Sequence, residues 1–202
     1  MRPFYLVSML LLAGCASPPT SFEQAQFQRY QQLADEVDAA NADLCGNEVC
    51  RPPLKLVSPQ SARSIGFAYG MTLNQARTIY VRADGLRVGM SDVEVARLMG
   101  HELAHVYLGH MALKPSPSEK QEDDADCVGT IFAVRAGYVA TGLPQFLKDR
   151  MAAGSQIQRA GYSSDSYADQ LIARAAQSAV ALKTADKPID RAAIKDICGV
   201  AP

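Results

Sequence analysis

Hydrophobic residues first recur at helical spacing in the stretch that follows Thr20. They fall on one face of a helix of about 3.6 residues per turn, and they are Phe27, Tyr30, Leu33, Val37 and Leu44. Thr20 and Glu23 have the spacing of a capping box, in which each side chain accepts a hydrogen bond from the backbone N–H of the other residue. The pattern therefore predicts a first helix that begins after Thr20 and ends near Leu44.

The next segments alternate between hydrophobic and polar positions, which is typical of half-buried strands. Residues 54–58 alternate in this way after the chain-breaking pair Pro52-Pro53. Residues 64–72 and 78–82 are two further strand candidates, separated by a turn region. We expect these strands to form a small antiparallel sheet.

Helical spacing returns at Ser91 and dominates the rest of the chain. Ser91 and Glu94 have the spacing of a second capping box, and the apolar face behind them predicts a helix over residues 91–109. Ser118 is placed to cap another helix over residues 119–136. Three more helices are expected over residues 143–153, through Leu171 to Leu182, and over residues 188–198. The predicted fold class is α+β: mostly helical, with the small antiparallel sheet packed beside the helix at 91–109.

Composition and charge limit the possible partners. The chain has 202 residues, of which 48% are hydrophobic, and this is enough for one domain with a buried core. Its 20 basic residues nearly balance its 21 acidic residues, so no basic excess is available to neutralise a phosphate backbone. We therefore expect no nucleic-acid partner.

The amino terminus has the pattern of a signal peptide. Residues 1–14 combine an early positive charge with an apolar run that is too short to span a bilayer. The ending Leu12-Ala13-Gly14-Cys15 resembles the lipobox of bacterial lipoproteins, which implies cleavage before Cys15 and lipidation of its thiol. Residues 15–20 would then be a lipidated tether and residues 21–202 a single domain. The alternative is a plain secretory signal in which Cys15 is incidental.

This resemblance also implies a place in the cell. Ala16 follows the cysteine, where an aspartate would resemble an inner-membrane retention signal. We therefore expect a protein of the bacterial cell envelope, attached to a membrane through lipid at Cys15, in the outer membrane and facing the periplasm.

Four cysteines remain once Cys15 is assigned to the lipid. An even number in an oxidising compartment indicates disulfides, although four cysteines allow three pairings. We expect Cys45 to pair with Cys50 around a Gly46-Asn47 turn, and Cys127 to pair with Cys198. The alternative is that these cysteines are buried free thiols.

All three histidines of the chain, His101, His105 and His110, lie within ten residues of one predicted helix. His101 and His105 are four residues apart, so both imidazoles lie on one face and can bind one ion. Glu102 borders this face, about 100° around the helix from His101 and about 60° from His105. Two histidines with such a carboxylate are what a zinc hydrolase needs, because the carboxylate can take a proton from metal-bound water.

A catalytic zinc needs a third protein ligand and keeps a fourth position for water. The metzincin spacing would require a histidine six residues after His105, and that position holds Met111. His110 is therefore expected to be an exposed residue at the helix end. A glutamate on the following helix is the other source of a ligand.

Two acidic pairs on that helix have a suitable spacing. Glu122 with Asp126 and Glu119 with Asp123 each place two carboxylates one turn apart. In either pair the second carboxylate could accept the outer N–H of a zinc-bound histidine. We prefer Glu122 with Asp126, because Ala125 permits close helix packing and because Glu122 lies one turn further into the helix.

Several segments between Ser64 and Ala153 occur in a characteristic order. They are Ile65-Gly66-Phe67-Ala68, Ile79-Tyr80-Val81 through Gly85-Leu86, the helix LMGHELAHVYLGH, Glu122-Asp123-Asp124-Ala125-Asp126, and Ala136-Gly137-Tyr138. In this order they resemble the gluzincin metallopeptidase family that includes the heat-shock protease HtpX, the CAAX prenyl endopeptidase and the periplasmic protease BepA.

The resemblance implies a zincin-like metallopeptidase domain that acts on a protein or peptide substrate. It implies one Zn2+ per subunit, held by His101, His105 and Glu122, with Glu102 as the general base and Asp126 behind the ligands. The chain departs from many relatives in having no downstream histidine, since residues 163–169 read SSDSYAD. Candidate donors to the transition state in its place are Tyr162, Tyr167 and Arg174, each of which is more readily explained as structural.

Three functions are compatible with these residues. The first is a zinc-dependent endopeptidase that hydrolyses envelope proteins by metal-activated water, in envelope protein quality control. The second is a zinc-binding, chaperone-like lipoprotein with little or no turnover, and the third is a metal-stabilised structural module. Glu102 favours the enzyme, because a protein that only binds zinc has no need of a base, and a His-His-Glu set leaves coordination open.

Overall fold

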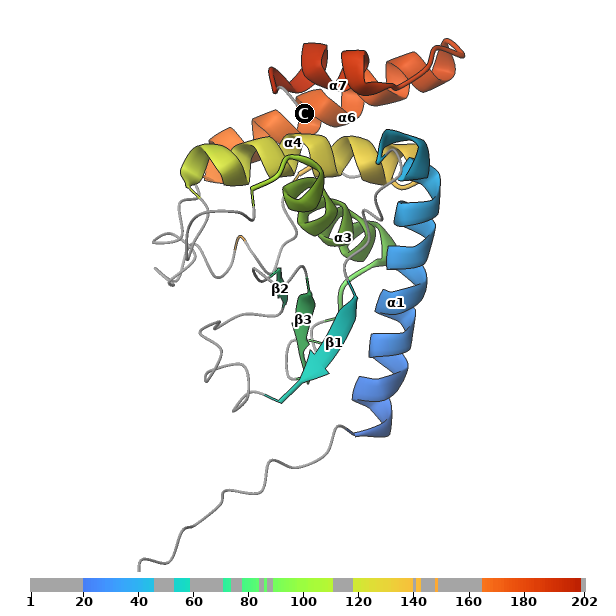
Figure 1. Ribbon diagram of the computed structural model, residues 1–202, viewed down its shortest axis with the longest axis vertical. Coiled ribbons are helices and arrows are strands. Elements are labelled where there is room, and N and C mark those ends of the chain that lie inside the picture. The colour runs from blue at the N-terminus through green and yellow to red at the C-terminus, as the bar shows by residue number, and fades with distance from the viewer. Residues whose placement is uncertain are drawn as a thin grey trace, which may run out of the picture.

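A computed structural model of the chain describes residues 20–45, 53–58, 71–73, 78–83, 86, 89–110, 118–139, 141–142, 148 and 165–200. The helices within these ranges are α1 (Ser21–Asn41), α3 (Asp92–Tyr107), α4 (Glu119–Arg135), α6 (Asp165–Thr184) and α7 (Arg191–Cys198). A short 3₁₀ helix, η1 (Ala42–Leu44), continues α1, and the strands are β1 (Leu54–Val57), β2 (Met71–Leu73) and β3 (Ile79–Arg82). The described part of the chain is mostly helical (Figure 1).

Capping boxes begin the three helices that build the middle of the molecule. In α1 the box joins Thr20 and Glu23, and in α3 it joins Ser91 and Glu94. In α4 the side chains of Ser118 and Gln121 cap each other's backbone N–H groups. The starts of all three helices lie where the sequence predicts them, because the capping interaction is local.

The sheet has three strands in the order β1-β3-β2. β1 pairs with β3 in parallel, with Leu54 opposite Ile79, whereas β2 pairs with β3 in antiparallel, with Met71 opposite Val81. The prediction of a purely antiparallel sheet is therefore wrong. Alternation of hydrophobic residues indicates a strand but not its direction. The long connection between β1 and β3 lets the chain return and run alongside β1 in the same direction.

Two hydrophobic cores hold these elements together. The first lies between the sheet, α1 and α3, and it buries Tyr30 and Leu33 of α1, Ile79 of β3 and Met99 of α3. The sheet thus packs beside α3, as expected (Figure 1). The second core lies around α4, which packs against both α3 and α6. α3 contributes to both cores, with Val95 and Met99 in the first and Ala96, Leu103 and Ala104 in the second.

Cysteines tie the end of the chain to α4. A disulfide joins Cys127 of α4 to Cys198 at the end of α7, with an S–S distance of 2.08 Å. Cys45 is also disulfide-bonded, and Cys50, its expected partner, lies outside the described residues. The signal peptide and Cys15 also lie outside them, as does the helix expected at 143–153 apart from Lys148. None of the helices in the described ranges is long and apolar enough to cross a membrane.

Candidate metal centre

The helices α3 and α4 meet at two glycines. A Cβ atom added to Gly100 would lie 2.3 Å from the carbonyl oxygen of Gly129, and one added to Gly129 would lie 2.4 Å from the backbone nitrogen of His101. The two backbones therefore touch, which no residue with a side chain would permit. The contact adjoins His101, so it brings the histidine face of α3 close to the acidic face of α4.

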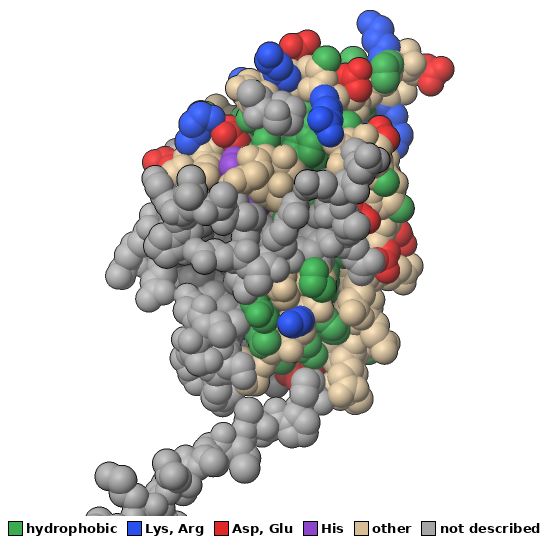
Figure 2. Space-filling view, viewed as in Figure 1, with side chains coloured by type: hydrophobic (Ala, Val, Ile, Leu, Met, Phe, Trp, Pro, Cys, Tyr) green, Lys and Arg blue, Asp and Glu red, His purple; other side chains and the backbone are tan. Residues whose placement is uncertain are grey.

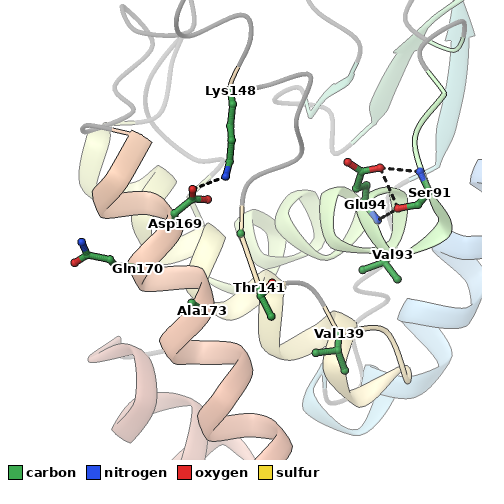
Figure 3. A pocket seen from close by; sticks show the side chains of 10 residues that line it. Ser91, Val93, Glu94, Val139, Thr141, Lys148, Asp169, Gln170 and Ala173 are labelled. Atoms are coloured by element: carbon green, nitrogen blue, oxygen red, sulfur yellow. Dashed lines mark hydrogen bonds and ion pairs between the residues drawn. The ribbon is translucent and has the colours of Figure 1, made fainter.

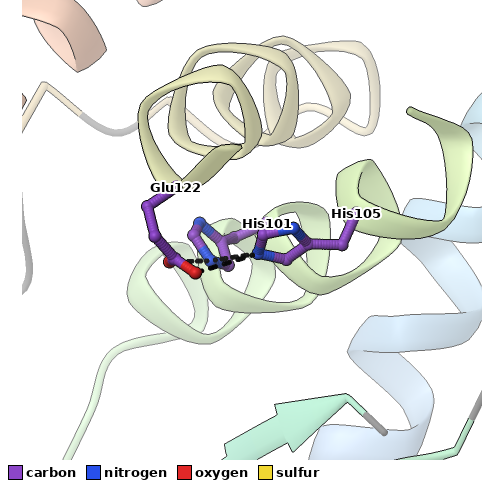
Figure 4. A group of neighbouring side chains, drawn as sticks. All are labelled: His101, His105 and Glu122. Atoms are coloured by element: carbon purple, nitrogen blue, oxygen red, sulfur yellow. Dashed lines mark hydrogen bonds and ion pairs between the residues drawn. The ribbon is translucent and has the colours of Figure 1, made fainter. Parts of the chain in front are cut away.

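Three buried side chains converge at this crossing (Figure 4). Nε2 of His101 lies 3.1 Å from Nε2 of His105 and 3.3 Å from Oε2 of Glu122, and Nε2 of His105 lies 3.6 Å from Oε1 of Glu122. Zinc bonds of about 2.0 to 2.1 Å at tetrahedral angles would separate the ligand atoms by about 3.4 Å. The three measured separations fit ligands that share one zinc ion.

The orientation of the imidazoles supports the same interpretation. Nδ1 of His101 lies 2.8 Å from Oδ1 of Asp126, so Nδ1 donates this hydrogen bond and Nε2 is the nitrogen that would bind a metal ion. Nδ1 of His105 lies 3.0 Å from Nδ1 of His110, so His110 could accept the outer proton of His105 when Nε2 of His105 binds a metal ion. The Nε2 atoms of both rings lie close to each other and to the Glu122 carboxylate. A metal ion between these atoms could bind both imidazoles and the carboxylate.

Charge at the site favours a cation as well. Burial alone lowers the pKa of His101, but the charges and hydrogen bonds of Asp126 and Glu122 outweigh it and raise this pKa to about 10. Burial and the neighbouring His101 and His110 hold the pKa of His105 well below its usual value. The two carboxylates thus favour positive charge beside His101, whether a proton or a metal ion supplies it.

Asp126 is ionised although no part of it is exposed. Burial opposes the charged carboxylate, but the charges of His101 and Arg97 outweigh this effect and lower its pKa. Asp126 lies on α4, one turn after Glu122. The carboxylate is therefore held on the outer side of His101, where it can fix the orientation of the ring.

The structure brings together most of the residues that the sequence singles out. His101, His105 and Glu122 are only 4 to 7% exposed, and Glu102 follows His101 on α3, half-buried. The rival Glu119 is exposed and does not join the cluster. Figure 2 shows a small area of histidine side chain at the surface, beside acidic and basic side chains.

Of the three candidate donors to the transition state, two are exposed on α6 and the third lies outside the described residues. Tyr167 is 49% exposed on α6, and Arg174 is exposed on the same helix. Tyr162 lies outside the described residues. None of the described contacts joins Tyr167 or Arg174 to the histidine cluster.

Sequence reasoning missed two residues at this site. His110, expected to be exposed, is half-buried and within hydrogen-bond distance of His105. Arg97, for which the sequence predicts no role, is buried and donates a hydrogen bond to Asp126. Its position one turn before His101 is a signal that could have identified it, since a charged residue on a buried helix face needs a partner.

A shallow pocket of about 690 Å³ lies between the start of α3, the chain after α4, and α6 (Figure 3). Its walls include Glu94, Val139 and an ion pair in which Nζ of Lys148 lies 2.5 Å from a carboxylate oxygen of Asp169. None of the described residues that line it belongs to the histidine cluster. The pocket is thus separate from the candidate metal centre.

The fold and the site define a class of protein: a helical domain in which two histidines of one helix and a glutamate of the next could hold a metal ion. The chain belongs to Peptidase family M48, whose sequence profile matches residues 28–186. Members of this family are metallopeptidases, and zinc is their typical metal. No curated protein and no solved structure matches the chain.

Proposed function

We propose that this chain is a zinc-dependent endopeptidase that hydrolyses peptide bonds of cell-envelope proteins, in envelope protein quality control. The observation that carries the proposal is the convergence of Nε2 of His101, Nε2 of His105 and the Glu122 carboxylate at separations of 3.1 to 3.6 Å. Membership of a metallopeptidase family supports it, because the family implies a protein substrate.

The donor set fits a catalytic zinc. Three protein ligands leave a fourth position open, and a bound zinc supplies Lewis acidity that activates water and polarises the scissile carbonyl. His101, His105 and Glu122 would hold the metal, and Asp126 would keep the His101 ring in place. This arrangement differs from a structural zinc site, in which protein side chains fill all four positions.

Glu102 is the residue that we propose to move the proton. It follows His101 on α3 and is half-buried, so its carboxylate borders the face that carries both histidines. In the proposed reaction Glu102 accepts the proton of the attacking water and passes it to the nitrogen of the leaving amine. The water oxygen forms the new bond to the carbonyl carbon as the C–N bond breaks.

The envelope location rests on the amino terminus and is supported by the cysteines. Residues 1–14 have the pattern of a signal peptide, and Cys15 has the position of a lipobox cysteine. The Cys127–Cys198 disulfide is consistent with an oxidising compartment such as the periplasm. We propose an outer-membrane lipoprotein that faces the periplasm.

The test of the proposal is substitution of the proposed base by its uncharged isostere. We expect the Glu102→Gln protein to bind one zinc ion per chain, as the wild type does, because the ligands are intact. Its cleavage of casein or an unfolded outer-membrane protein should fall about 100-fold to 10,000-fold, the usual contribution of a general base. Metal content is measured by elemental analysis and cleavage by release of peptides.

Glu119→Gln is the matched control, because Glu119 is an exposed glutamate at the start of α4. This variant should retain both zinc and cleavage. A wild-type protein that binds zinc and retains unfolded clients without cleaving them would contradict the proposal. That outcome would instead identify a zinc-binding, chaperone-like lipoprotein.

A further inference from the structure

Arg97 carries a charge into the interior of the protein. It lies on α3 one turn before His101, and it is only 1% exposed. Its Nη1 donates a hydrogen bond of 2.9 Å to Oδ1 of Asp126. Nε and Nη2 of Arg97 have no hydrogen-bond partner in the described part of the chain. Among the described residues, the guanidinium of Arg97 is therefore held by its hydrogen bond to Asp126.

One oxygen of Asp126 joins this arginine to the metal centre. Oδ1 accepts from Nη1 of Arg97 at 2.9 Å and from Nδ1 of His101 at 2.8 Å. Oδ2 of Asp126 is buried and, among the described residues, has no hydrogen-bond partner. The orientation of the Asp126 carboxylate thus depends on the two groups that donate to Oδ1. Of these two, His101 is one of the proposed metal ligands and Arg97 is not.

A purely structural role does not explain this arrangement well. Replacing both members of a buried ion pair by apolar residues is often neutral or stabilising, so such a pair is weak evidence for stability alone. The Arg97–Asp126 pair is completely buried and its acidic member also bonds His101. The positive charge of Arg97 also balances the negative charge of Asp126. The negative charge of Glu122 is then the net charge of these three residues, and it can face a metal ion.

We propose that Arg97 is a positioning residue for the zinc site. It holds Asp126 of α4 so that the carboxylate accepts the Nδ1 proton of His101, which directs Nε2 of His101 toward His105 and Glu122. This inference rests on the proposed zinc function, and it adds a residue that touches neither the metal ligands nor the substrate. The arginine acts on His101 only through Asp126.

The test measures zinc affinity, by competition with a chelator, in the wild type and in the Arg97→Met and Arg97→Lys proteins. We expect Arg97→Met to weaken zinc binding about 10-fold, the low end for loss of a residue behind the ligands. Arg97→Lys keeps a buried donor and charge, and should recover most of the affinity. In the zinc-loaded proteins, the Nδ1 proton resonance of His101 should shift in Arg97→Met and return toward its wild-type position in Arg97→Lys.

Arg135→Met is the matched control. Arg135 is a partly buried arginine at the last residue of α4, and its Nη2 lies 2.7 Å from Oδ1 of Asp43. It should change neither zinc affinity nor the His101 resonance. A folded Arg97→Met protein with wild-type affinity and resonance would overturn the inference, and so would an equal loss in Arg135→Met. Failure of the wild type to bind zinc would overturn the proposed function itself.

A further comparison applies if Arg97→Met does not fold. The double variant Arg97→Met with Asp126→Asn leaves no unpaired charge in the core, and it is compared with Asp126→Asn alone. If Arg97 acts only through Asp126, both proteins bind zinc equally. A further loss of affinity in the double variant would overturn the inference.

Discussion

The outer nitrogen of His105 lies 3.0 Å from Nδ1 of His110, in the turn that follows α3. With a metal ion on Nε2 of His105, its Nδ1 would carry the proton and Nδ1 of His110 would accept the hydrogen bond. Burial lowers the pKa of His110, which favours the neutral ring that can accept. The two histidines of the site therefore use different partners, a carboxylate behind His101 and an imidazole behind His105.

Loss of this acceptor should weaken metal binding. We expect His110→Ala to bind zinc about 10-fold more weakly than the wild type, because the outer N–H of His105 loses its partner. His110→Gln should bind more tightly than His110→Ala, since the amide oxygen can accept the same proton. Competition with a chelator measures both, and equal affinity of His110→Ala and the wild type would show that the contact does not support the site.

At the scale of elements, the crossing of α3 and α4 sets the site. Gly100 and Gly129 allow the backbones to touch beside His101. The N-terminal half of α4 then places Glu122 opposite His101 and His105, and Asp126 behind His101. The separation of the ligands is thus determined by how closely two helices approach.

A methyl group at this crossing should disturb both the fold and the site. In Gly129→Ala the added Cβ would overlap the backbone of His101, so the helices must separate, and we expect a loss of about 1 to 3 kcal/mol in the free energy of unfolding. Zinc affinity should fall as well, because Glu122 moves away from the histidines. Denaturant unfolding and chelator competition measure the two effects.

Gly89→Ala is the control, because a Cβ at Gly89 has no atom within 4 Å and its backbone does not require glycine. This variant should match the wild type in stability and in zinc affinity. If Gly129→Ala behaved in the same way, the close approach of the helices would not determine the site.

Local interactions made the helices and the paired histidines predictable from sequence. The boxes at Ser91 and Ser118 involve residues three apart, and His101 and His105 share a face by helical period alone. The parallel pairing of β1 with β3 was not predictable, because it depends on the path of the chain between them. The sequence favours Glu122 over Glu119 by its place in the helix and by Ala125, and the crossing of α4 with α3 places it at the histidines.

At the scale of the whole molecule, the candidate metal centre lies where α3, which contributes to both cores, packs against α4 of the second core. The family profile begins within α1 and ends after α6, so α7 lies beyond the matched residues. α7 is nevertheless integrated, since Ile194 is buried in the second core and Arg191 donates hydrogen bonds to the carbonyl of Leu44. The C-terminal helix thus contacts the region where α1 ends.

The proposed anchor predicts a lipid on the intact chain. Cells fed radioactive palmitate should produce labelled wild-type protein and unlabelled Cys15→Ala protein, because lipidation of a lipobox requires the cysteine thiol. Cys45→Ala should keep the label, since it leaves Cys15 in place. Gel electrophoresis after immunoprecipitation gives the result, and an unlabelled wild type would show that the chain is not a lipoprotein.

The Cys127–Cys198 disulfide makes the stability of the folded protein depend on the compartment in which the chain folds. It connects residues 71 apart in sequence, and in the chain-entropy description a link of that span stabilises a protein by about 4 kcal/mol. Cys127 directly follows Asp126, so the cross-link fixes the helix that carries both carboxylates of the candidate metal centre. Recombinant protein made in a reducing cytosol would lack this disulfide. Exported, oxidised protein is therefore the appropriate sample for metal titrations.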